Sequence, residues 1–397
     1  MKILMLTAGT RGDVEPFVAL AHRAHANGHE VRLSVPDNAG ADLGGIDTVS
    51  LHVDFAALVA GGGVSPWATA AAFRQVIRPA VGRMLATAVE HIVAYAPDVV
   101  VYHPTVLTAP MAAHALNIPT VVVESVPSLS PTREFASPVV SAASLGPFNR
   151  ATYGAVALAC RLFGHEIAAA CRSLPPGHRS SARPRASLMP ISPQLLVRPR
   201  DWPADVHLTG SWPPAHAGPG GDSELDDFMD GGEFICAGFG SMKAGEATKR
   251  GQIIIDAARR YGVNVLIITG WGGLDVSGAA CGRGVLVRES VDHGHVFPMA
   301  KAVIHHGGAG TVHAVARAGI PSVVVPFIAD QGFWGNLLHR QALAPKPIPY
   351  RRLTRDRLAR ALAESGAYRD NARRVGECIQ SEDGLAAAVD VLENLVG

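Results

Sequence analysis

Short apolar runs alternate with amphipathic stretches along most of the chain, a pattern that indicates strands alternating with helices. Residues 2–7 form the first apolar run, and a glycine turn at residues 9–12 follows it. Residues 14–27 then show helical periodicity, and residues 30–35 form a second apolar run. Strand, helix and strand in this order make a βαβ unit, which requires a parallel sheet and a right-handed crossover.

The same alternation continues through the first half and starts again in the second. In the first half we expect strands at 99–102 and 120–123, with a helix at 108–116 between them. In the second half we expect strands at 234–238, 263–269, 284–288, 302–304 and 322–326, and helices at 249–261, 355–364, 368–377 and 384–395. The pattern predicts an α/β protein with two Rossmann-like domains facing a cleft, where ligands bind at the carboxyl ends of the strands.

A proline-rich stretch separates the two halves. Residues 199–222 carry five prolines and several glycines, which break the periodicity. We therefore expect an N-terminal domain at residues 1–200, an interdomain linker at 201–222 and a C-terminal domain at 223–397. The last helix of the chain is expected to pack back on the N-terminal domain.

Composition narrows the class of protein. The 397 residues carry a net charge of +1, and 48% of them are hydrophobic, which argues against a nucleic-acid binder and against disorder. The five cysteines are widely spaced without a C-x-x-C pair, which favours reduced thiols over a disulfide framework or a zinc site. The apolar stretch 151–171 contains Arg161, His165 and Glu166, so it indicates an amphipathic helix instead of a membrane span. With no signal peptide evident, we expect a cytoplasmic protein of undetermined oligomeric state.

The strongest chemical signal is the heptad at residues 305–311, which reads His-His-Gly-Gly-Ala-Gly-Thr. An apolar run precedes it, and residues 312–318 continue as a helix. A helix N-terminus carries unpaired N–H groups and the positive end of the helix dipole, so it favours phosphate. The alternative is a tight turn that only packs strand against helix. The residues expected to bind a diphosphate are His305, Gly308, Ala309, Gly310 and Thr311. His306 suits a core position equally well, and His313 has no assigned role.

Further motifs stand in a fixed order along the chain. Residues 7–16 read Thr-Ala-Gly-Thr-Arg-Gly-Asp-Val-Glu-Pro, residues 198–203 read Arg-Pro-Arg-Asp-Trp-Pro, and residues 239–242 read Phe-Gly-Ser-Met. Val291, His293, the heptad and Ala329-Asp330-Gln331 follow. In this order and spacing, the motifs resemble the GT-B glycosyltransferases that move sugars from nucleotides to small-molecule acceptors. The resemblance is to the antibiotic glycosyltransferases of actinomycetes and to the sterol glucosyltransferases.

The resemblance implies an N-terminal acceptor domain and a C-terminal domain that holds a UDP- or dTDP-sugar as co-substrate, without a separate cofactor. It also implies inversion at the anomeric carbon and no bound metal, and the chain has no Asp-x-Asp triplet. The expected partners are a nucleotide-sugar and a hydrophobic small molecule from antibiotic or secondary-metabolite biosynthesis.

Sugar transfer needs a base for the acceptor hydroxyl, donors for the departing diphosphate and contacts that orient the sugar. Asp13 is the candidate base, because it follows the first strand and faces the expected cleft. A helix cap is the alternative, and a histidine base elsewhere in the domain stays open. Asp330 and Gln331 suit sugar hydroxyls, with an Asx turn as the alternative.

The other candidate contacts follow from the resemblance. Ser241 lies opposite the heptad and is expected to join the diphosphate site. Val291 and His293 fall in the loop that binds the nucleoside. Thr10 and Arg11 are candidates for a phosphate or acceptor contact, with a surface role for Arg11 as the alternative.

The acceptor side is less defined. The segments 55–82 and 125–150 mix glycine, proline and apolar side chains, and they suit either an apolar acceptor pocket or ordinary loops and helix cores. We expect both to lack the charge that a strongly anionic acceptor needs, which favours a hydrophobic aglycone. A sterol-type UDP-glucosyltransferase, a nucleotide-sugar epimerase on the same architecture and a non-catalytic nucleotide-sugar binder are the alternatives.

Overall fold

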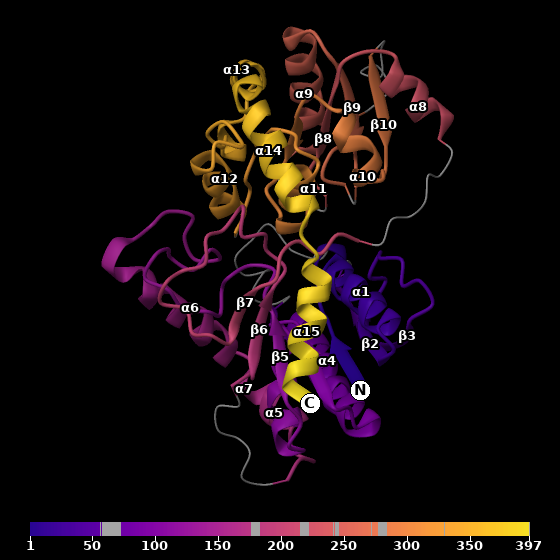
Figure 1. The fold of residues 1–397 in the computed structure, drawn as a ribbon, viewed down its shortest axis with the longest axis vertical. Coiled ribbons are helices and arrows are strands. Elements are labelled where there is room, and N and C mark those ends of the chain that lie inside the picture. The colour runs from indigo at the N-terminus through magenta and orange to yellow at the C-terminus, as the bar shows by residue number, and fades with distance from the viewer. Residues whose placement is uncertain are drawn as a thin grey trace.

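Two parallel sheets, each covered by helices, make up the protein (Figure 1). The computed structural model describes residues 1–55, 57, 73–175, 183–214, 222–240, 242, 246–270, 272–276, 284–328 and 330–396. Within this part of the chain, no helix is both long and apolar enough to cross a membrane. The α/β class with two Rossmann-like domains, predicted from the sequence, is confirmed.

The first sheet has seven strands in the order β3-β2-β1-β4-β5-β6-β7. Its strands are β1 (Lys2–Leu6), β2 (Glu30–Asp37), β3 (Asp47–Asp54), β4 (Val99–Tyr102), β5 (Thr120–Val123), β6 (Ala186–Met189) and β7 (Val206–Leu208). Its helices are α1 (Arg11–Ala26), α4 (Arg78–Tyr95), α5 (Ala109–Ala115), α6 (Asn149–Arg161) and α7 (Gly164–Ala170), with a π-helical turn, η1 (Phe73–Ile77), before α4. The strand order reverses between β1 and β4, which marks the point where ligands bind in such sheets.

The second sheet has five strands in the order β10-β9-β8-β11-β12. Its strands are β8 (Phe234–Gly238), β9 (Asn264–Ile268), β10 (Val285–Arg288), β11 (Val303–His305) and β12 (Ser322–Val324). The helices are α8 (Ser223–Asp230), α9 (Ala247–Tyr261), α10 (His293–Val296), α11 (Ala309–Arg317), α12 (Gln331–Arg340), α13 (Arg355–Ser365), α14 (Arg369–Gln380) and α15 (Gly384–Val396). Here the order reverses between β8 and β11.

Side chains that alternate along the strands pack into two separate cores, as expected for a sheet buried on both faces. In β1, Ile3 and Met5 pack with helices α1 and α15, whereas Leu4 and Leu6 pack with α4 and α5. This burial on both faces explains why the strands appear in the sequence as continuous apolar runs.

A further apolar cluster joins the two domains. Ile191, Leu195 and Trp202 of the first domain pack with Phe333 and Trp334 of the second. The chain then returns after α14, and α15 lies against α1 of the first domain (Figure 1). This return gives the N-terminal half a helix from the far end of the chain.

Polar contacts fix the segment where the chain crosses back. The carboxylate of Glu382 accepts hydrogen bonds from the Ser192 hydroxyl at 2.7 Å and from the Ser211 amide at 3.3 Å. The indole of Trp212 donates to the carbonyl of Gly384 at 3.0 Å. The crossing is therefore held by groups from both halves.

Some elements differ from the sequence predictions. The amphipathic helix expected at 151–171 is two short helices, α6 and α7. Strand β7 lies inside the stretch 201–222 that we assigned to the linker, so the first sheet extends to Leu208. The domain boundaries themselves stay predictions, and residues 215–221 of the linker lie outside the described part of the chain.

The helix that follows the glycine heptad, α11, packs closely against α14. A methyl group added at Gly376 would lie 2.6 Å from the Cα atom of Gly319, at the end of α11. We expect Gly376→Ala to lower the free energy of unfolding by about 1–3 kcal/mol, because backbone cannot yield as a flexible side chain does. Thermal unfolding measures this. The control is Gly366→Ala, where nothing lies within 4 Å, and equal melting temperatures for the two variants would contradict the account.

Candidate functional site

The loops at the two reversal points carry most of the residues singled out by the sequence. The turn after β1 and the loop after β4 belong to the first domain, and the loops after β8 and β11 belong to the second. In sheets of this kind, ligands bind where the two loops diverge from neighbouring strands. The Asp13 carboxylate contributes to raising the pKa of Asp330, so these two carboxylates, one from each domain, lie close enough to interact.

The backbone after β11 forms an anion cradle. Gly307 has a φ of +93°, and a Cβ there would lie 2.9 Å from the carbonyl oxygen of Gln331, so only glycine fits. Gly308 is the N-cap of α11, and it has no side chain to bond the first turn. Among the described residues, no acceptor is recorded for the amides of Ala309, Gly310 and Thr311. These donors stay open to an anion.

His305 and His306 differ sharply in their surroundings. His305, the last residue of β11, is fully buried, and its Nδ1 accepts the Gly307 amide at 3.1 Å. Burial lowers its pKa to about 3, so the ring is neutral near pH 7. Its Nε2 is buried without a hydrogen-bond partner among the described residues. The diphosphate contact assigned to His305 from the sequence stays a prediction.

The ring of His306 borders the cradle. A Cβ at Gly308 would lie 2.5 Å from the His306 Nε2, and one at Gly240, in the loop after β8, would lie 3.6 Å from Cε1. Burial lowers the pKa of His306 to about 4. His305 ends β11, whereas His306 lies in the loop beyond it, so the end of the apolar run is the signal that could have distinguished the two.

Asp13 combines the two interpretations that the sequence left open. Its Oδ2 accepts hydrogen bonds from the amide of Thr10 at 2.7 Å and from its hydroxyl at 3.1 Å, which closes the first turn of α1. Its Oδ1 lies 3.6 Å from Nε2 of His103. The cap therefore fixes the carboxylate and leaves its other oxygen directed at a histidine.

His103, which follows β4, is the residue that sequence reasoning missed. The Thr105 hydroxyl donates to the carbonyl of Ala8 at 2.9 Å, so it accepts at 2.8 Å from Nδ1–H of His103. The approach of the Thr105 amide to the same nitrogen is longer, 3.4 Å, and weaker. Nε2 of the neutral ring is then an acceptor beside Asp13. Burial lowers the pKa of His103, and Asp13 partly offsets that effect.

Asp330 and Gln331 stand at the start of α12. Oδ2 of Asp330 accepts from the indole of Trp334 at 2.9 Å, and burial, with a smaller contribution from Asp13, raises the pKa of Asp330. The carboxamide of Gln331 is buried: its Oε1 accepts the amide of Phe327 at 2.8 Å. Its Nε2 donates to the Met242 sulfur at 3.2 Å. Their contacts with a sugar stay predictions.

The expected nucleoside loop carries His293 at the start of α10. The ring of His293 stacks on Phe297 with centroids 4.3 Å apart. The His293 residue is exposed, yet desolvation lowers its pKa to about 4, with Arg11 as the second cause. Arg11 is itself paired with Glu15 at 2.6 Å on the surface of α1. The roles assigned to Val291, His293, Thr10 and Arg11 stay predictions.

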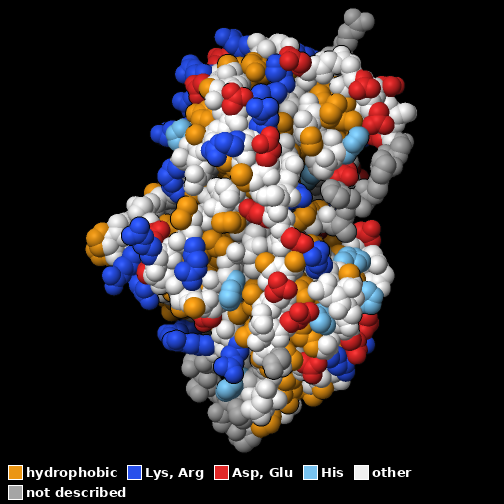
Figure 2. Space-filling model, viewed as in Figure 1, with side chains coloured by type: hydrophobic (Ala, Val, Ile, Leu, Met, Phe, Trp, Pro, Cys, Tyr) orange, Lys and Arg blue, Asp and Glu red, His pale blue; other side chains and the backbone are white. Residues whose placement is uncertain are grey.

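Other predicted site features are placed elsewhere or lie outside the description. Ser241 lies outside the described residues. Phe135 from the segment 125–150 packs on Phe333 of the second domain, with centroids 5.3 Å apart, so it contributes to the domain contact. Phe148 of the same segment is 70% exposed and immediately precedes α6. Figure 2 shows hydrophobic side chains at the projecting left edge of the molecule. Within the described residues, no group of three or more His, Cys, Asp or Glu side chains could hold a metal ion.

Two family models match the chain. Residues 3–143 match the glycosyltransferase family 28 N-terminal domain, and residues 279–395 match the C-terminal domain of the erythromycin biosynthesis protein CIII-like family. The two matches cover the loops after β1 and β4 in one domain and the heptad in the other.

Curated relatives extend the likeness over the whole chain. It is 31% identical to O-mycaminosyltylonolide 6-deoxyallosyltransferase of Streptomyces fradiae, over 99% of this chain and 97% of the relative. It is 30% identical to a sterol 3-beta-glucosyltransferase of Arabidopsis thaliana, over 98% of this chain. The chain spans only 64% of the length of that plant protein.

Solved structures share the fold. The glycosyltransferase of kitacinnamycin superposes with a TM-score of 0.73 at 17% identity, covering 100% of this chain and 99% of that one. A glycosyltransferase of Streptomyces sp. SF2575 complexed with thymidine diphosphate gives a TM-score of 0.65 at 20% identity, covering 99% of each chain. Matched along its full length by an enzyme that transfers a deoxyallose, this chain belongs to the glycosyltransferase family and has the GT-B fold.

Proposed function

We propose that the protein is an inverting glycosyltransferase that moves a hexose from a dTDP- or UDP-sugar to a hydroxyl of a hydrophobic natural-product aglycone. The observation that carries this proposal is that the two domains contribute complementary groups. The pair formed by Asp13 and His103 belongs to the first domain, and the open first turn of α11 belongs to the second, whose Asp330 lies close enough to Asp13 to interact with it. The first group offers a base to the acceptor, and the second offers an anion-binding site to the diphosphate of the donor.

The cradle supplies the leaving-group site in this proposal. The amides of Ala309, Gly310 and Thr311 donate to the diphosphate, and the Thr311 hydroxyl adds a further donor. Neutral His306 donates through a ring N–H at the same place. These donors stabilise the charge that develops on the diphosphate as its bond to the sugar breaks.

The Asp13–His103 pair supplies the base. His103 Nε2 takes the proton of the acceptor hydroxyl, and the Asp13 carboxylate stabilises the imidazolium that results. The hydroxyl oxygen attacks the anomeric carbon as the bond to the diphosphate oxygen breaks, so one displacement inverts that carbon. Asp330 at the start of α12 orients the sugar. The proposal uses no cofactor beyond the sugar nucleotide.

The relatives support the choice of substrates. The matched enzyme of Streptomyces fradiae is named for transfer of a deoxyallose to a tylonolide, which favours a natural-product acceptor. The neighbour with thymidine diphosphate favours a dTDP-sugar donor. The plant relative keeps a sterol acceptor with UDP-glucose as the alternative, and incubation of the protein with pooled aglycones and both donors distinguishes them by product mass.

Removal of the base should affect transfer without affecting donor binding. We expect His103→Gln to lower kcat by roughly 10²–10⁴-fold, and Asp13→Asn to lower it in the same direction. The dissociation constant of the nucleoside diphosphate should stay within about twofold in calorimetry, because the cradle lies in the other domain. Near-normal turnover in His103→Gln would return the role of base to Asp13.

The acid side of the pH profile should report His103. Burial lowers the pKa of His103, so Nε2 stays unprotonated near neutral pH. The kcat/KM for the acceptor should therefore fall only at pH values below 6.5, the ordinary pKa of histidine. Since the Asp13 carboxylate raises the pKa of His103, that pKa should be lower still in Asp13→Asn. The residual activity of this variant should therefore fall at a lower pH than the activity of the unaltered protein. A shift of that limb to higher pH would contradict the pairing.

The cradle can be tested by binding alone. We expect His306→Ala to raise the dissociation constant of dTDP or UDP by about 10–100-fold, the equivalent of a lost hydrogen bond to a charged group. His295→Ala, on the exposed side of α10, is the matched control. Equal affinities for the two variants would remove His306 from the diphosphate site.

A further inference from the structure

His313, in the second turn of α11, is a buried histidine that the proposed mechanism does not use. It is 6% exposed, and both of its ring nitrogens have partners. Nδ1 lies 2.8 Å from the carbonyl oxygen of Ala309, and Nε2 lies 3.3 Å from the backbone amide of Ser192. Ala309 belongs to the cradle, whereas Ser192 follows β6 in the first domain. One side chain therefore contacts both the diphosphate site and the other domain.

The two partners determine which ring nitrogen carries the proton. The carbonyl of Ala309 can only accept, so Nδ1 of His313 is a donor. The amide of Ser192 can only donate, so Nε2 is an acceptor. Burial lowers the pKa of His313 to about 4, which keeps the ring neutral near pH 7. A proton on Nε2 would instead direct one N–H group at another.

The bond to Ala309 fixes one of the donors of the cradle. The carbonyl of Ala309 and the amide of Gly310 belong to the same planar peptide unit and point in opposite directions. Because His313 holds the carbonyl, it also directs the N–H of Gly310 toward the open end of α11. Gly310 has no side chain, and even an added Cβ would have no neighbour within 4 Å among the described residues. The hydrogen bond therefore supplies a restraint that packing does not.

The bond to Ser192 ties the same ring to the contact between the domains. Ser192 is fully buried, and its hydroxyl donates to Oε1 of Glu382 at 2.7 Å, in the segment where the chain crosses back. The ring of Trp334 packs edge-on against His313, with centroids 5.5 Å apart. Neighbours from three parts of the chain thus restrain the ring.

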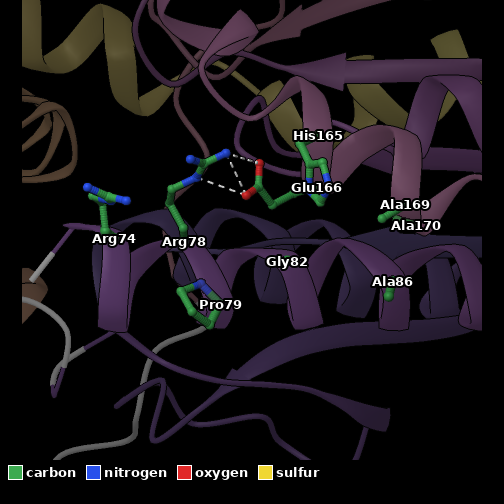
Figure 3. A pocket seen from close by; sticks show the side chains of 9 residues that line it. All are labelled: Arg74, Arg78, Pro79, Gly82, Ala86, His165, Glu166, Ala169 and Ala170. Carbon is green, nitrogen blue, oxygen red and sulfur yellow. Dashed lines mark hydrogen bonds and ion pairs between the residues drawn. The ribbon is translucent and has the colours of Figure 1, made fainter.

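A strong polar contact within the first domain has no such reach. Arg78 makes a forked contact with Glu166, at 2.9 and 3.1 Å, across the hollow between α4 and α7 (Figure 3). The expectation that the segment 55–82 lacks charge is wrong at Arg74 and Arg78. Because both partners of this contact belong to the first domain, it holds α4 against α7 and does not place the cradle.

We propose that His313 is a positioning residue, which fixes the Ala309–Gly310 peptide of the cradle and holds it in register with the domain that carries the base. The N–H groups of Ser192, His313 and Gly310 donate in one direction, so each polarises the next toward a bound anion. The effect on transfer rests on the proposed function, whereas the effect on diphosphate binding needs no acceptor.

Two conservative variants separate the two bonds. His313→Gln keeps an acceptor at the position of Nε2, and His313→Asn keeps a donor at the position of Nδ1. We expect His313→Gln to raise the dissociation constant of dTDP or UDP by about 3–10-fold and to leave kcat within about threefold. We expect His313→Asn to leave that constant within about twofold and to lower kcat by about 10–100-fold, because the domains lose their register. Calorimetry and steady-state kinetics measure the two quantities.

His339→Gln and His339→Asn are the matched controls. His339 on α12 also contacts a carbonyl through Nδ1, that of Ala344 at 3.0 Å, but within its own domain. Both quantities should stay unchanged in these controls. If the two His313 variants change affinity and kcat in parallel with a fall in melting temperature, the role of His313 is structural and the proposal is overturned. Unchanged values in both His313 variants would overturn it as well.

A measurement on the unaltered protein covers the case in which the variants do not fold. Nitrogen NMR of isotope-labelled histidine near pH 7 should show His313, assigned by its proximity to Trp334, as a neutral ring with its proton on Nδ1. A proton on Nε2 would overturn the proposal. If no acceptor is glycosylated, the proposed function fails, while the affinities and the position of the proton still test the link between Ser192 and the cradle.

Discussion

The open amides at the first turn of α11 are the feature on which the site depends. They are available because Gly307 takes a left-handed conformation beside the backbone of Gln331 and because Gly308 caps the helix without a side chain. A side chain at either position would collide with the backbone of Gln331 or with the ring of His306. The cradle is therefore set by the backbone, and its electrostatic field is fixed before any ligand arrives.

Contacts contributed by both halves hold the two domains together. The apolar cluster around Trp202 and Trp334 joins the halves, and Glu382 fastens the segment where α15 returns to the first domain. His313 of α11 also accepts the Ser192 amide of the first domain at 3.3 Å. The indole of Trp334 donates a hydrogen bond to Asp330 and packs edge-on against the ring of His313. This buried residue therefore connects the start of α12 with the contact between the domains.

Sequence patterns predicted the elements that bury continuous apolar runs or carry glycine motifs. The strands at 99–102, 120–123 and 234–238 agree with the structure, because both faces of a parallel strand are buried. His103 escaped prediction because no motif marks the residue after β4, and only the strand order brings it beside Asp13. His306 escaped because two adjacent histidines look alike until it is known that β11 ends between them.

The stereochemistry of transfer tests the central claim most directly. In the proposed mechanism the base and the leaving group lie on opposite sides of the anomeric carbon, so a single displacement inverts it. Nuclear magnetic resonance of the product formed from an α-linked sugar nucleotide should show a β-glycoside, with one nucleoside diphosphate released per sugar transferred. An α-glycoside, or an isomerised sugar nucleotide formed without any acceptor, would contradict it.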